Sequence, residues 1–595
     1  MTSTDPQRYD QPEGTPDTEA SDQAAHAKAV TTDEHLPEGI ATIAASTGTL
    51  DDESYAQAMV ESAAFADGDN GSGIALPSWA MSFLAFCDVW LSRLGDRMNP
   101  ILVKEARQAL KSRQFVATFF LLLSFAWAWT LLGVAIFTIN SPDQSPPGWA
   151  MLIGYFLVLV VPILLVVPYS AFRSLAAERE DGTFELVSIT SLSATQVITG
   201  KLFSALLQLL VCFSVLAPCM VFTYVLRGVD IAIIGLTLGY SVMCGFLFIV
   251  VGLVMGAASK SRHWNTFFSI CLFIAFAVGG WGFCAFILSA VITSDGIPID
   301  EIDFWIGNLT VLTIYAGYIM LLLLASAAQI SFPSDNRSTR LRVTMVALQV
   351  IFVGWGFFYL SRYSDPEILA AVLFGSAAHW MLMGWFMIGE SGRISPRARR
   401  KLPKTAIARA VFTWFNPGAR TGYLLVVANM LMLLALITIG GEIAVRETDT
   451  VRQFGRRLGQ VQWTTVLVVF YVIFYLGVTS LTLEVLRMFG KIGLFISLMV
   501  GVVILTMGAG IPPLAQQWAE QRTNITYSPA QAFNWVWSIG EVVDGDISHT
   551  KNPGTLVIMG FSALLVLVVN LGLAVRDVMV VAEAVPRRVL EDDAA

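Results

Sequence analysis

The sequence predicts an all-α polytopic membrane protein with about 12 transmembrane helices. Of its 595 residues, 55% are hydrophobic and only 14% are charged, which is too little polar surface for a soluble protein of this size. The apolar runs are continuous over about 20–25 residues, which is the length that a helix needs to cross the hydrocarbon core of a bilayer. A transmembrane β-barrel would instead show alternating strands of roughly ten residues.

Acidic residues concentrate at the N-terminal end. Residues 1–75 contain 15 Asp and Glu against Arg8 and Lys28, a net charge of -13, whereas the whole chain carries -8. This stretch is rich in small and polar residues, has almost no aromatics and lacks periodicity, so it is predicted to be a disordered tail. The rest of the chain is therefore basic.

Residues 76–115 are predicted to form interfacial and connecting helices. The first is predicted to be amphipathic and to lie in the headgroup plane, because large apolar residues recur three and four positions apart. The alternative is a cytosolic helix whose apolar face packs against protein. A second, basic helix at 101–114 leads into the first span. The apolar positions of the first helix are Trp79, Phe83, Phe86, Trp90 and Leu94.

Twelve apolar spans follow, six within 116–330 and six in a second membrane region, 342–577; residues 578–595 form a tail. Lys and Arg set the orientation. With the N-terminus inside, residues 76–115, the inside loops and the C-terminal tail hold 27 cations and the outside loops hold eight, so both termini are predicted to be cytoplasmic. Four of the outside cations lie between the ninth and tenth spans. Either these residues form a solvated surface helix, or the predicted pairing of the spans is wrong there. The spans are 116–138, 149–171, 202–226, 231–257, 267–293, 305–329, 342–361, 368–389, 423–445, 462–484, 492–517 and 553–577.

Motifs for catalysis are missing. The Gly-Lys pairs at 200–201 and 490–491 are followed by Leu202 and Ile492, so neither is a P-loop. No stretch resembles a zinc-protease motif or a nucleophile elbow, and the six cysteines include no CxxC pair. We therefore expect no catalytic residues, no metal site and no cofactor in this chain, and no nucleic-acid partner.

The polar stretch 174–201 separates the second and third spans. Its first part, RSLAAERED, continues the second span as a helix, and Gly182 is a natural residue to end that helix before a turn at Thr183. Ser193 can cap a new helix, and Gln196 at its third position completes a capping box. The stretch is predicted to be a helix–turn–helix rigidly attached to two membrane helices, so a push on it would tilt both.

This stretch resembles a segment of the permease subunits of type-2 ATP-binding-cassette (ABC) exporters, which reads E-R-E-x-G-T-x-E-L-L, then Pro/Leu-Ser, then G-K. An Asn-Pro-x-x-x-Lys-Glu motif upstream, at Asn99, Pro100, Lys104 and Glu105, also resembles that family. The likeness covers about residues 97–330; Ser191 stands where the family often has proline. The matching positions in the stretch are Glu178, Arg179, Glu180, Gly182, Thr183, Glu185, Leu186, Leu192, Ser193, Gly200 and Lys201.

The resemblance implies a six-helix permease domain at 116–330 whose segment 174–201 docks on a separate ABC ATPase subunit, which would hold ATP and Mg²⁺. It also implies a multi-pass protein of a bacterial-type inner membrane, with a second permease copy or a homodimer as an option. The region 342–577 contains no second copy of the glutamate/Gly-Thr segment found in 174–201, although Asn416 and Pro417 match the first two residues of the Asn-Pro motif. The substrate is not predicted.

Two other classes stay open. A self-contained secondary transporter would carry paired buried charges or broken helices near the middle of the membrane. His379 is the ionisable residue that lies well inside a span, and it has no carboxylate three or four positions away. A non-transporting membrane scaffold is the other alternative, with the acidic tail as its binding arm.

Overall fold

The computed structural model divides the chain into two units, Met1–Met98 and Asn99–Ala595. All residues that it describes belong to the second unit. Several predicted segments lie outside the described residues: the acidic tail, the amphipathic helix with its apolar positions at 79–94, the turn residues Thr183, Glu185 and Leu186, and most of the C-terminal tail. The described ranges are 99–140, 148–182, 192–226, 229–259, 261–292, 298–332, 335–390, 414–446, 451–490, 493–521, 526–544 and 553–582.

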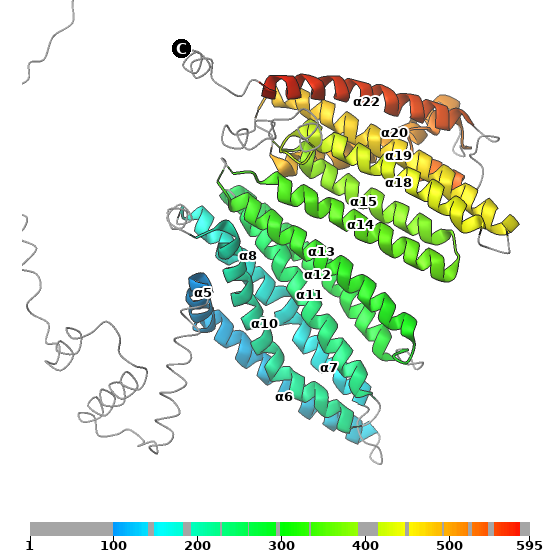
Figure 1. Ribbon diagram of the computed structural model, residues 1–595. Helices are drawn as coiled ribbons and strands as arrows, with labels where there is room; N and C mark the ends of the chain where they lie inside the picture. The colour runs from blue at the N-terminus through cyan, green and yellow to red at the C-terminus, as the bar shows by residue number, and fades with distance from the viewer. Residues whose placement is uncertain are drawn as a thin grey trace, which may run out of the picture. The chain divides into compact units, whose positions relative to one another are not determined.

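Every regular element in these ranges is helical, and twelve helices are long and apolar enough to cross a bilayer. The prediction of an all-α protein with about 12 spans is therefore confirmed, and each predicted span coincides with one of the twelve. The long helices lie side by side (Figure 1). Many of their large apolar side chains are exposed, as expected for helices surrounded by lipid.

The first half contains α5 (Pro100–Leu110), α6 (Arg113–Asn140), α7 (Gly148–Val161), the π-helix η1 (Pro162–Val166), α8 (Val167–Glu180), α10 (Ala194–Val225), α11 (Ile231–Ala258), α12 (Arg262–Ile292) and α13 (Ile302–Ile330). The predicted connecting helix 101–114 is divided. It ends at Leu110, and the Ser112 hydroxyl accepts a hydrogen bond from the Phe115 amide (3.2 Å) where α6 begins. The sequence did not indicate this break, because basic residues that are compatible with a helix lie on both sides of it.

The second half contains α14 (Ser338–Tyr363), α15 (Glu367–Ile388), α18 (Ala419–Arg446), α19 (Val451–Arg487), α20 (Leu494–Glu520), the 3₁₀ helix η2 (Pro529–Gln531), α21 (Trp535–Val543) and α22 (Pro553–Ala582). Of the cations between the ninth and tenth spans, Arg446 ends α18 and the other three lie in the first turns of α19, so they belong to extensions of the two long helices. There Arg457 forms an ion pair with Glu367 (3.3 Å).

Two hydrophobic cores correspond to the halves. One joins α6, α7, α10 and α11, and the other joins α14, α15, α18 and α19. The halves meet where α13 packs against α14. Tyr318 also connects α13 to α15: its hydroxyl lies 3.0 Å from Nδ1 of the buried His379.

Successive long helices run in opposite directions, so the end of one lies on the same side of the bundle as the start of the next. The ends of α8, α11, α13, α15 and α19 share a side with the starts of α10, α12, α14, α18 and α20. We call this side the Lys201 end, after the residue in the first turns of α10. The helix α5 also lies there, packed against α10 (Figure 1).

Candidate functional site

Local sequence shapes both sides of the predicted turn. Helix α8 ends at Glu180, and Gly182 follows with φ +70°, a left-handed conformation that suits glycine and disfavours side chains with a Cβ. Helix α10 starts after Ser193, whose hydroxyl accepts from the Gln196 amide while the Gln196 side chain accepts from the Ser193 amide. The predicted helix end and capping box are both confirmed. Leu192 is half-buried beside the cap.

Lys201 is the centre of an ion-pair cluster. Its ammonium lies 3.0 Å from a Glu105 carboxylate oxygen and 2.9 Å from one of Glu178. The Lys201 side chain is only 2% exposed, whereas those of Glu105 and Glu178 are 15% and 21% exposed. We call Glu105, Glu178 and Lys201 the α5 cluster. It joins α5, α8 and α10 through side chains from the stretch that begins at Asn99 and from the stretch 174–201.

Close backbone packing supports the α5 cluster. Asn99 caps α5 by accepting from the Ile101 amide (3.1 Å), and its side-chain amide donates to the Gln196 carbonyl of α10 (2.5 Å). A Cβ on Gly200 would lie 2.9 Å from the Cβ of Ile101, so glycine is what allows α5 to approach α10 this closely. Pro100 starts the helix, and Lys104 is exposed on its outer side.

Arg179 and Glu180 extend this arrangement to three further helices. The Arg179 guanidinium donates to the carbonyls of Ala257 and Gln329, in the last turns of α11 and α13. Glu180 accepts from the Asn265 amide (2.8 Å) and lies 3.9 Å from Arg262, both at the start of α12. Arg179 thus satisfies carbonyls that helix ends leave without an intrahelical partner.

A second cluster lies at the same end in the other half. The fully buried Arg342 forms an ion pair with Glu390 (2.7 Å) and donates to the carbonyls of Trp414 and Gly418 (2.8 Å each) and to the Thr421 hydroxyl (3.0 Å). We call these residues the α18 cluster, because they hold the chain in front of α18.

Sequence reasoning named the members of the α5 cluster from two motifs but did not predict that Lys201 is shared by carboxylates from both. It did not predict the α18 cluster, whose Arg342 and Glu390 are 48 residues apart in the sequence. Within the described residues, no group of three or more His, Cys, Asp or Glu side chains could hold a metal ion.

Comparison with known proteins adds no relative: no protein-family model, no curated protein and no solved structure matches this chain. The functional interpretation therefore depends on the residues and their geometry.

Proposed function

We propose that this chain is the permease subunit of a type-2 ABC exporter, which moves a substrate across the membrane with energy from ATP hydrolysed by a separate ATPase subunit. In this proposal the Lys201 end faces the cytoplasm, and the segment between α8 and α10 is the docking site of the ATPase. The observation that carries the proposal is the α5 cluster, in which residues of two separate permease-like stretches share one buried ammonium.

The geometry supports transmission of force from this segment. Helix α8 continues through η1 into α7, and α10 is itself a span, so both sides of the turn are extensions of membrane helices. Arg179 adds contacts to the ends of α11 and α13. A force on residues 181–193 would therefore move several spans together.

The η1 segment gives this pathway a place to bend. It is a five-residue π-helix that begins at Pro162, and Pro168 follows in the first turn of α8. Single π-turns inside α-helices recur at functional sites and change helix direction locally. We propose that α8 tilts about this segment when the ATPase closes.

Gly182→Val tests the docking segment without touching the α5 cluster. A β-branched residue is strained at φ +70°, by about 1–3 kcal/mol, so the turn should change its path. A purified full-length chain should capture a P-loop ATPase, identified by mass spectrometry and by ATP hydrolysis. The variant should weaken capture on the order of tenfold.

Gly490→Val is the matched control. Gly490 follows α19 at the same end, and a Cβ there would also meet nothing within 4 Å, but its φ lies outside the left-handed range. Capture of no P-loop ATPase by the wild-type chain, or equal capture by both variants, would refute the proposal.

A further inference from the structure

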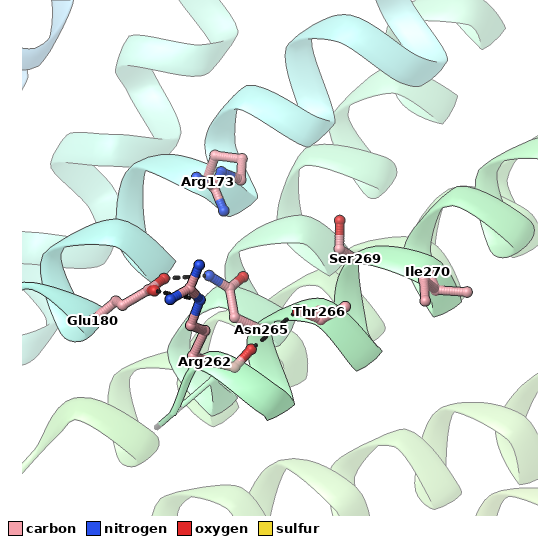
Figure 2. Close-up of a pocket in the computed structure, with 7 residues that line it drawn as sticks. All are labelled: Arg173, Glu180, Arg262, Asn265, Thr266, Ser269 and Ile270. Carbon is pink, nitrogen blue, oxygen red and sulfur yellow. Dashed lines mark hydrogen bonds and ion pairs between the residues drawn. The ribbon is translucent and has the colours of Figure 1, made fainter.

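A basic hollow opens between α8 and α12 at the Lys201 end. It has a volume of about 290 Å³, and its lining includes Arg173 of α8 together with Arg262, Thr266 and Ile270 of α12 (Figure 2). Glu180 and Asn265 form one wall, where they are hydrogen-bonded to each other.

The charges in the hollow favour an anion. The lining carries two guanidinium groups, of Arg173 and Arg262, and one carboxylate, of Glu180. That carboxylate already accepts a hydrogen bond from Asn265 (2.8 Å) and lies 3.9 Å from Arg262. Across the hollow, Arg173 is exposed and forms no ion pair with any residue that the structure describes. Guanidinium groups bind phosphate oxygens through paired, charge-assisted hydrogen bonds.

An apolar surface leads away from the hollow along α12. Ile270 lines the hollow and is 57% exposed, and it is followed on the same face by the exposed Ile274, Val278 and Trp281. These positions recur at helical spacing, so they form one stripe directed along the span. A ligand with a phosphate at one end and acyl chains at the other would contact both parts.

We propose that this hollow binds the phosphate of an anionic phospholipid from the membrane leaflet at the Lys201 end, with the acyl chains along the α12 stripe. A free phosphate would use the same two arginines, but it would leave the stripe unused. The proposal does not depend on an ATPase partner. Because Glu180 belongs both to the hollow and to the end of α8, a bound lipid would contact the arm that carries the turn at Gly182.

Native mass spectrometry of the full chain with phosphatidylglycerol and phosphatidylcholine tests the site. The wild type should retain phosphatidylglycerol preferentially, and Arg173→Gln/Arg262→Gln should weaken its binding on the order of tenfold, since each arginine near a membrane surface contributes to binding of anionic lipid. The control is Arg340→Gln, which removes an exposed arginine in the first turn of α14 at the same end. It should leave binding unchanged.

A second pair of variants guards against a folding defect. Thr266 is exposed and lines the hollow, so Thr266→Glu should place a negative charge there and reduce binding, whereas Thr266→Gln should not. Equal retention by the wild type and the double arginine variant would overturn the proposal, as would an equal loss in Arg340→Gln. Displacement of the lipid by millimolar inorganic phosphate or glycerol 3-phosphate would also overturn it, because the site would then take a free phosphate.

Discussion

The two halves of the bundle hold their non-spanning segments at the Lys201 end by different means. In the α5 cluster, side chains from three helices meet around one ammonium, and its two carboxylates keep partial contact with solvent. In the α18 cluster, a fully buried guanidinium donates to two main-chain carbonyls as well as to Glu390. The first arrangement fixes helices to one another, whereas the second fixes the path of the chain itself.

The Asn-Pro motifs show the same difference. Asn99 and Pro100 start the separate helix α5, but Asn416 and Pro417 come just before α18, which is a span. Within the described residues, the second motif starts no separate helix like α5. We infer that the α18 cluster braces a connection between spans, while the α5 cluster supports the segment that we propose as the docking site.

The largest effect is expected from Arg342→Met. The change removes the ion-pair partner of Glu390 and one donor to each of the Trp414 and Gly418 carbonyls, and breaking a buried ion pair in this way costs about 3–5 kcal/mol. Thermal unfolding in detergent should show a large drop in the melting temperature. Arg362→Met is the control, because its pair with Asp303 is exposed and should contribute little. Similar melting temperatures for both variants would contradict the assigned role of Arg342.

Lys201→Met should destabilise the protein by about 3 kcal/mol, at the lower end of this range, because among the described residues Lys201 donates to two partly exposed carboxylates and to no main-chain carbonyl. Glu178→Gln should interact with it: in a double-mutant cycle the two changes should cost less together than the sum of each alone, by about 1–3 kcal/mol. The free energy of unfolding of the four proteins measures this coupling. Additive costs would mean that the pair does not act as a unit.

The smallest effect concerns the contact between α5 and α10. Gly200→Val places side-chain atoms against Ile101 and Asn99, so α5 should move outward at a cost of about 1–3 kcal/mol. Faster hydrogen exchange in Pro100–Leu110 would report this movement. Gly235→Val on α11, where a Cβ meets nothing within 4 Å, should leave exchange in α5 unchanged. Unchanged exchange in Gly200→Val would contradict the close packing.

Features set by neighbouring residues were predictable from the sequence. Continuous apolar runs located the twelve spans, and the capping box at Ser193 and the helix end at Gly182 follow from a few adjacent residues. Pairs distant in sequence were not predictable, because local patterns do not say which helices become neighbours. Glu105 and Lys201 are 96 residues apart, and Arg342 and Glu390 are 48 apart.

The proposed function requires that the ATPase moves the end of α8 relative to the second half. Spin labels at Asp181 and Met488, both exposed at the Lys201 end, measure this directly when introduced as unnatural amino acids that leave the native cysteines unlabelled. In the complex with the captured ATPase, adding ATP should shift the distance distribution between the labels. The chain alone should show no shift. A distribution that ignores ATP in the complex, or that shifts equally without the ATPase, would contradict the account.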